Sequence, residues 1–208
     1  MQERFSYKFS YKGVTMNFIA KQLILGSVIG LMGLGLGGCG GASVSPEHAK
    51  QVADHAQMHT QVPMFAQGSS ITTLNYVTGF PIPVNSIVFY EDVNSKQLAF
   101  TFNQKRYYLR NAPRYSQTNM DQMLDRYFAT KKVDISKFTK KEQKMIKAAK
   151  VEVGMSKEAV ILAYGYPPVH ATPSLDMDDW KYWKWQHGYA SDTLILHFKN
   201  NKLSSIED

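Results

Sequence analysis

Residues 154–165 read GMSKEAVILAYG, which predicts one short helix with both ends marked. Ser156 suits the N-cap position, because its side-chain oxygen can accept a hydrogen bond from a free amide of the first turn. Gly165 suits the position after the helix, where the backbone often needs a positive φ, and Pro167 and Pro168 prevent its continuation. The sequence therefore predicts a helix between Ser156 and Gly165.

A strand rich in aromatic residues follows this helix. Residues 180–185 read WKYWKW and include all three tryptophans of the chain. Successive side chains of a strand point to opposite faces, so Trp180 and Tyr182 are predicted to share one face and Trp183 and Trp185 the other.

The end of the chain predicts a β-hairpin. Residues 193–199 alternate, with Leu194, Leu196 and Phe198 expected to face inward. Asn200-Asn201 suits a two-residue turn that needs positive φ, and residues 202–206 supply the returning strand. Together, residues 153–206 predict a helix, a strand and a hairpin.

This segment resembles the BamE (SmpA/OmlA) family of envelope lipoproteins. The residues that carry the resemblance keep the order and spacing of the family: Gly154-Met155-Ser156-Lys157, Val160, Gly165 and Pro167, Trp180 and Tyr182, Leu196 and Phe198, and Asn201 and Leu203. The resemblance implies an α+β domain over residues 131–208, in which two helices pack on a three-stranded antiparallel sheet. The best-known member belongs to the machinery that inserts β-barrels into the outer membrane.

The first of these two helices is predicted in a lysine-rich segment, which has eight lysines between Lys131 and Lys150. Thr139 and Glu142 have the spacing of a capping box, in which each residue bonds the backbone amide of the other. Met145, Ile146 and Ala149 form the apolar stripe, which leaves Lys140, Lys144 and Lys147 on the opposite side. These lysines suit anionic phospholipid headgroups, although a solvated helix face that aids solubility is the default interpretation.

The N-terminal segment is typical of a lipoprotein signal peptide, predicted over residues 1–38. Lys21 precedes an apolar run from Leu23 to Leu36, and Gly37-Gly38-Cys39 completes a lipobox. Cys39 is the only cysteine, so an internal disulfide is excluded and its sulfur is the predicted lipid attachment site. Gly40 differs from the Asp that is typical of inner-membrane retention in enteric bacteria. We therefore expect an outer-membrane lipoprotein that faces the periplasm.

Residues 39–70 are predicted to be a lipidated tether, because Ala, Gln, Ser, Gly and His dominate them. Ser45 and Pro46 can begin one weakly amphipathic helix inside it. His55 and His59 are four residues apart, a spacing that can hold a metal, but no carboxylate pattern accompanies them. We interpret both histidines as solvated and expect no metal.

Residues 71–130 are predicted to form a small antiparallel β-rich region followed by a helix. The expected strands are residues 71–78, 84–91, 97–102 and 106–110. This sheet either closes as a small SH3-like barrel or packs on the following helices. Thr118 is expected to cap a core-facing helix, whose apolar positions are Met120, Met123, Leu124, Tyr127 and Phe128.

Arginines and tyrosines alternate near the end of this region. Arg106, Arg110 and Arg114 lie beside Tyr107, Tyr108 and Tyr115. Such a mixture can bind a glycan, a nucleic acid or an anionic headgroup, but aromatic residues are also favoured in ordinary strands, and we prefer that interpretation. The net charge of +7 falls when the basic leader is removed, and nucleic acid is not an expected partner.

The sequence predicts a non-enzymatic envelope protein that acts as a scaffold or interaction module, without a cofactor. The expected partners are envelope proteins, among them the β-barrel assembly machinery, and anionic phospholipid. The alternatives are an accessory subunit of a secretion or surface machine and a module that inhibits an enzyme. A peptidoglycan hydrolase built on His170, His187 or His197 is a third choice, since no catalytic motif is present. The predicted contact residues are Lys140, Lys144, Lys147, Lys157, Trp183 and Trp185.

Overall fold

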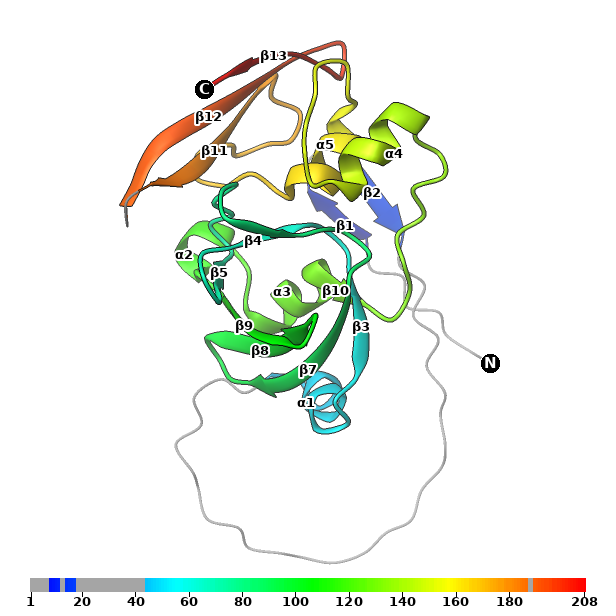
Figure 1. The fold of residues 1–208 in the computed structure, drawn as a ribbon, viewed down its shortest axis with the longest axis vertical. Helices are drawn as coiled ribbons and strands as arrows, with labels where there is room; N and C mark the ends of the chain where they lie inside the picture. The colour runs from blue at the N-terminus through cyan, green and yellow to red at the C-terminus, as the bar shows by residue number, and fades with distance from the viewer. Residues whose placement is uncertain (1–7, 12–13, 18–43, 187–188) are drawn as a thin grey trace, which may run out of the picture. The chain divides into compact units, whose positions relative to one another are not determined.

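The computed structural model describes residues 8–11, 14–17, 44–186 and 189–208, and it divides the chain into two compact units, residues 1–41 and 42–208 (Figure 1). In the first unit, β1 (Lys8–Tyr11) pairs antiparallel with β2 (Val14–Asn17). The remainder of the predicted signal peptide and the predicted lipid attachment site, Cys39, lie outside the described residues.

The predicted tether is wrong from Ser45 onward, because residues 45–70 are folded. Ser45 caps α1 (Pro46–Ala53), as expected, and β3 (Gln57–Thr60), β4 (Met64–Ala66) and β5 (Ser70–Thr72) follow it. Met58 and Met64 are buried, and His59, which was expected to be solvated, is only 9% exposed. β3 and β5 contain polar side chains, and β4 has only three residues, so no long apolar run marks these strands.

The β-rich region is larger than predicted and is a mixed sheet. Its strand order is β10-β3-β7-β8-β9-β5, with β7 (Ile87–Val93), β8 (Gln97–Phe102), β9 (Lys105–Arg110) and β10 (Phe128–Ala129). All neighbours are antiparallel except β5 and β9, which are parallel. Residues 79–83, which separate two of the expected strands, contain β6 (Phe80–Ile82), which pairs with β4.

Two helices follow this sheet, α2 (Pro113–Ser116) and α3 (Met120–Tyr127). Figure 1 shows α3 at the centre of this region, between β4 and the strands β7 to β9. Met123 and Leu124 of α3 and Phe100 of β8 are buried together in a first core. The N-cap of α3 is Asn119 rather than Thr118, and it forms a capping box with Gln122. Thr118 is itself buried and donates a hydrogen bond to Ser116 Oγ.

The C-terminal region has the predicted α+β arrangement of two helices and a three-stranded antiparallel sheet. The helices are α4 (Lys140–Lys147) and α5 (Lys157–Tyr164), and the sheet has the order β11-β12-β13, with β11 (Asp179–Gln186), β12 (Tyr189–Lys199) and β13 (Lys202–Glu207). Trp180, Tyr182 and Leu196 are buried with residues of both helices in a second core. Asn200 and Asn201 both have positive φ, as their turn requires.

The two cores share an interface inside the unit of residues 42–208. Asn75 donates hydrogen bonds from its side chain to the carbonyl oxygens of Tyr164, at 2.7 Å, and Tyr166, at 2.8 Å. Gly165 lies between these two residues with φ +77, and a Cβ added there would lie 3.0 Å from Asn75 Nδ2. The boundary predicted between residues 130 and 131 therefore falls inside one compact unit.

A segment of the N-terminal region also covers the outer edge of β11. Val77 N–H donates to the carbonyl oxygen of Trp183 at 3.0 Å, and Trp185 N–H donates to Thr78 Oγ1 at 2.8 Å. Further along the same edge, Lys181 N–H donates to Thr172 Oγ1. Unpaired edge strands invite pairing with other chains, so this cover protects the sheet.

Candidate interaction surface

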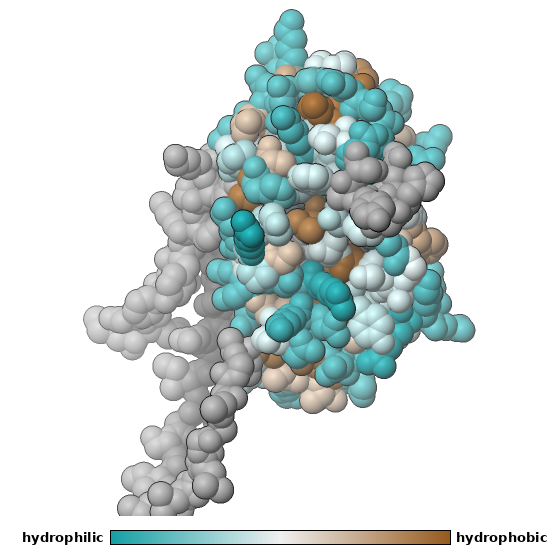
Figure 2. All heavy atoms as spheres, turned by 90° about the vertical axis from the view of Figure 1, so that its left-hand side faces the viewer, coloured by the Kyte–Doolittle hydropathy of each residue, from teal (hydrophilic) through white to brown (hydrophobic). Residues whose placement is uncertain are grey.

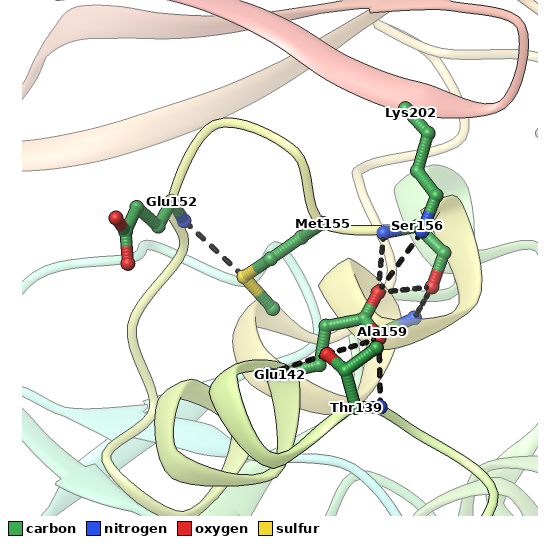
Figure 3. A network of polar contacts seen from close by, with 7 residues as sticks. All are labelled: Thr139, Glu142, Glu152, Met155, Ser156, Ala159 and Lys202. Atoms are coloured by element: carbon green, nitrogen blue, oxygen red, sulfur yellow. Dashed lines mark hydrogen bonds and ion pairs between the residues drawn. The ribbon is translucent and has the colours of Figure 1, made fainter.

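A single carboxylate fixes the position of α4 against α5 and the β12–β13 hairpin (Figure 3). Glu142 completes the predicted capping box with Thr139, and its Oε1 also accepts hydrogen bonds from the N–H of Ser156 at 2.8 Å and from Ser156 Oγ at 2.9 Å. Ser156 in turn caps α5 by accepting from Ala159 N–H. Lys202 Nζ lies 3.4 Å from the same carboxylate.

Glu142 is 6% exposed. Burial alone would raise the pKa of Glu142, but the hydrogen bonds from Ser156 and Thr139 stabilise its charged form and lower the pKa to about 2. The carboxylate is therefore ionised at neutral pH. It holds two helix N-termini together, which gives the outer side of α4 a defined orientation.

The outer side of α4 carries the three predicted lysines, and we call Lys140, Lys144 and Lys147 the lysine face. All three are exposed, and none forms an ion pair with another residue in the described part of the chain. In contrast, Lys137 pairs with Glu158, and Lys141 pairs with Glu152 at 2.8 Å. Like charges one turn apart repel each other, so an anionic surface that neutralised these lysines would stabilise the helix.

Lys157, also predicted to contact a partner, is engaged within the fold. Its Nζ donates to the carbonyl oxygens of Asp176 at 3.1 Å and Met177 at 2.8 Å, and it lies 5.7 Å from the ring centre of Trp180. Its side chain is 13% exposed. Lys157 thus holds the loop that leads into β11 and does not extend the lysine face.

Trp183 and Trp185 lie in a group of rings at the junction of the two cores. We call this group the aromatic cluster, and it consists of Tyr76, Tyr115, His170, Trp183 and Trp185. The ring centres of His170 lie 4.8 Å from Tyr115 and 5.6 Å from Trp183, and those of Tyr76 and Trp185 are 5.1 Å apart. Trp183 is half-buried, whereas Trp185 is 37% exposed and is the more accessible of the two.

Of the three histidines considered for a hydrolase, His170 and His197 lie in the described part of the chain, and each has different neighbours. His197 Nδ1 lies 2.7 Å from Asp179 Oδ1, and its Nε2 lies 3.2 Å from Glu207 Oε2. Contacts from both ring nitrogens to carboxylates require the protonated imidazole, because a neutral ring has one N–H. His170 belongs to the aromatic cluster, and His187 lies outside the described residues.

Sequence reasoning missed a second histidine that lies between two carboxylates. His48 of α1 lies 2.6 Å from Asp121 and 3.2 Å from Asp125, both on α3. Asp121 also accepts a hydrogen bond from Ser45 N–H. More than seventy residues separate His48 from these partners, so no local pattern could have indicated the contact.

Three further observations bear on function. Within the described residues, no cluster of His, Cys, Asp and Glu could hold a metal ion. No helix in that part of the chain is long and apolar enough to cross a membrane. Comparison with known proteins gives no match among family models, curated proteins or solved structures.

Proposed function

We propose that this chain is a lipid-anchored protein of the bacterial outer membrane, facing the periplasm, that acts as an interaction module and places the lysine face of α4 against anionic phospholipid headgroups. The observation that carries the proposal is that Lys140, Lys144 and Lys147 share one exposed helix face without an ion-pair partner among the described residues. A cation near an anionic bilayer contributes about 1 kcal/mol. Three such lysines supply appreciable affinity.

The resemblance to the BamE family supports a role in outer-membrane assembly or maintenance. The α4, α5 and β11-β12-β13 arrangement has the helix and strand content that the resemblance implies. The lipobox that ends at Cys39 supports the anchor. Under this proposal the anchor supplies attachment, and the lysine face sets the orientation of the domain against the headgroups.

Vesicle binding by residues 42–208, made without the leader, tests the lysine face. Sedimentation with phosphatidylglycerol vesicles should show salt-sensitive binding that is absent with phosphatidylcholine. The triple variant Lys140→Gln, Lys144→Gln, Lys147→Gln should weaken binding by roughly a hundredfold, from about 1 kcal/mol per lysine. Equal binding by this variant would refute the proposal for this face.

A control variant with the same change in net charge separates the lysine face from general attraction. Lys137→Gln, Lys141→Gln, Lys199→Gln removes three lysines, two of which are paired with glutamates. This variant should bind much more tightly than the first. In cells, labelling with a radioactive fatty acid should mark the wild type and not Cys39→Ala, and equal labelling would exclude Cys39 as the attachment site.

A second candidate function is a protein contact through the aromatic cluster, as in an accessory subunit of an envelope machine. Exposed Trp185 favours it, because tryptophan is enriched among residues that dominate binding energy at interfaces. A photo-crosslinker at position 185 in intact cells should capture one partner reproducibly. The same crosslinker at exposed Lys199 is the control and should not capture that partner.

A further inference from the structure

We propose that a hollow on the outer face of the mixed sheet binds a phosphate group and that Arg110 is the residue that anchors it. The hollow has a volume of about 230 Å³ and is lined by Ser70, Gln97, Tyr108 and Arg110. This site lies on the mixed sheet, whereas the lysine face lies on α4 beside the second core. The inference does not depend on the lipid anchor or on the lysine face.

The strand register brings these four side chains together. Arg110 of β9 lies opposite Gln97 of β8, and Tyr108 of β9 lies beside Ser70 of β5. Residues two apart on a strand point to the same face, so Tyr108 and Arg110 project together. The pairings of Arg110 with Gln97 and of Tyr108 with Ser70 therefore place the four lining side chains on adjacent strands.

The polar ends of all four side chains are free to bind a ligand. In the described part of the chain, none of them forms a hydrogen bond or ion pair with another residue. Arg110 offers five N–H donors, and the Ser70 and Tyr108 hydroxyls and the Gln97 amide add further donors. A donor-rich hollow with one guanidinium matches an oxyanion, which arginine binds with two parallel hydrogen bonds.

The structure separates Arg110 from the two arginines near it in the sequence. Arg106 Nε is 2.7 Å from Glu91 Oε2, and Arg114 lies 5.7 Å from the ring centre of Tyr115. Within the described residues the Arg110 side chain has no such contact, and Asp92 on the neighbouring strand β7 forms no ion pair with Arg110. Among these three arginines, the guanidinium of Arg110 is therefore the one available to a ligand.

The surrounding surface is compatible with a polar ligand. Figure 2 shows the side of the molecule that carries α2 and β5, where hydrophilic side chains dominate and apolar ones form small separate patches. The hollow lies on strands of this part of the sheet. The four lining residues all carry polar groups, which disfavours an apolar occupant and leaves the charge of Arg110 as the main source of selectivity.

The experiment is a titration of the ¹⁵N-labelled full chain in a neutral detergent, followed by NMR at the backbone amides and the arginine Nε–H groups. Sodium phosphate is added at constant ionic strength, with sodium chloride as the reference. We expect saturable shifts at Ser70, Gln97, Tyr108 and Arg110. Arg110→Gln should weaken the affinity at least tenfold, and Arg110→Lys by less, because lysine keeps the charge but not the paired donors.

The matched control is Arg114→Gln, which removes the same group from an exposed position outside the hollow. It should leave the phosphate affinity unchanged. A second arm replaces free phosphate with phosphatidylglycerol in the micelle, and saturation in this arm alone would assign the phosphate to a lipid headgroup. Shifts that do not saturate in either arm, or an affinity that Arg110→Gln leaves unchanged, would overturn the proposal.

Discussion

Glu142 is the residue at which the caps of α4 and α5 and the side chain of Lys202 meet. A capping-box glutamate normally bonds the amides of its own helix end, but Glu142 also bonds Ser156, the cap of the next helix. The sequence predicted both caps correctly. It could not show that the two helix ends meet at one carboxylate, because that depends on how α4 and α5 pack.

Replacing Glu142 with Gln should lower the free energy of unfolding by about 2 kcal/mol at neutral pH, because a hydrogen bond to a charged group contributes roughly 1.5 to 3 kcal/mol. Urea denaturation of both proteins measures the difference. Glu158→Gln is the control, since Glu158 is 61% exposed in its ion pair with Lys137 and should contribute less than about 1 kcal/mol. A loss no larger than that of the control would contradict the role of Glu142.

The same residue predicts a pH dependence. The pKa of Glu142 is lowered from 4.5 to about 2, so its stabilisation is complete above pH 4.5 and is lost as the pH falls toward 2. The difference in stability between wild type and Glu142→Gln should therefore shrink across this interval. A difference that stays constant down to pH 2 would exclude the lowered pKa.

At the scale of elements, His197 joins the three strands of the C-terminal sheet. It lies on β12 and contacts Asp179 of β11 and Glu207 of β13. The hydrogen bond with Asp179 and, to a smaller extent, the hydrogen bond with Glu207 raise the pKa of His197 above its ordinary 6.5. The stabilisation from this contact is present below pH 6.5 and is lost as the pH rises through the raised pKa.

NMR titration of the His197 ring should give a pKa above 6.5 in the wild type. Asp179→Asn should lower this pKa more than Glu207→Gln does, because Asp179 makes the shorter contact, 2.7 Å against 3.2 Å. Asp176→Asn, an exposed change in the preceding loop, should leave it unaltered. A wild-type pKa at or below 6.5 would show that the ring is not held between the two carboxylates.

At the scale of the whole molecule, the unit of residues 42–208 depends on contacts between its two cores. Phe65, Val77 and Val84 come from the N-terminal region but are buried in the second core. Ile161 and Tyr166 come from the C-terminal region but pack against the first. Such exchange of side chains couples the two cores, so we expect them to unfold in one cooperative step.

Asn75→Ala should test this coupling. It removes two hydrogen bonds to carbonyl groups and places Ala at φ +52, so the free energy of unfolding should fall by about 3 kcal/mol. Tryptophan fluorescence, which reports on β11, and far-UV circular dichroism should show the same midpoint in wild type. Two separate wild-type transitions would show that the cores are independent.

Asn75→Gly is the matched variant, because glycine tolerates the positive φ but lacks the amide. It should destabilise the protein less than Asn75→Ala, and the difference measures the backbone strain. If both variants retained wild-type stability, the hydrogen bonds of Asn75 to Tyr164 and Tyr166 would not hold the interface together.

By itself, the sequence determined the local features of this protein. The limits of α5 at Ser156 and Gly165, the capping box of α4, the shared face of Trp180 and Tyr182 on β11 and the Asn200-Asn201 turn were all predicted and are confirmed. Each depends on residues within a few positions of one another, through caps, backbone φ preferences and the alternation of a strand. The sequence also supplied the three lysines on one side of α4.

Only the tertiary structure decided which segments meet. It placed residues 45–70 in the fold, paired β5 parallel to β9, covered the edge of β11 with residues 76–78 and left the Arg110 side chain without an ion pair among the described residues. These outcomes depend on strand pairing between distant segments, and short polar strands carry almost no local signal for their partners. Local interactions therefore determine where the helices and strands begin and end, whereas the burial of side chains in the two cores determines which segments pack against each other.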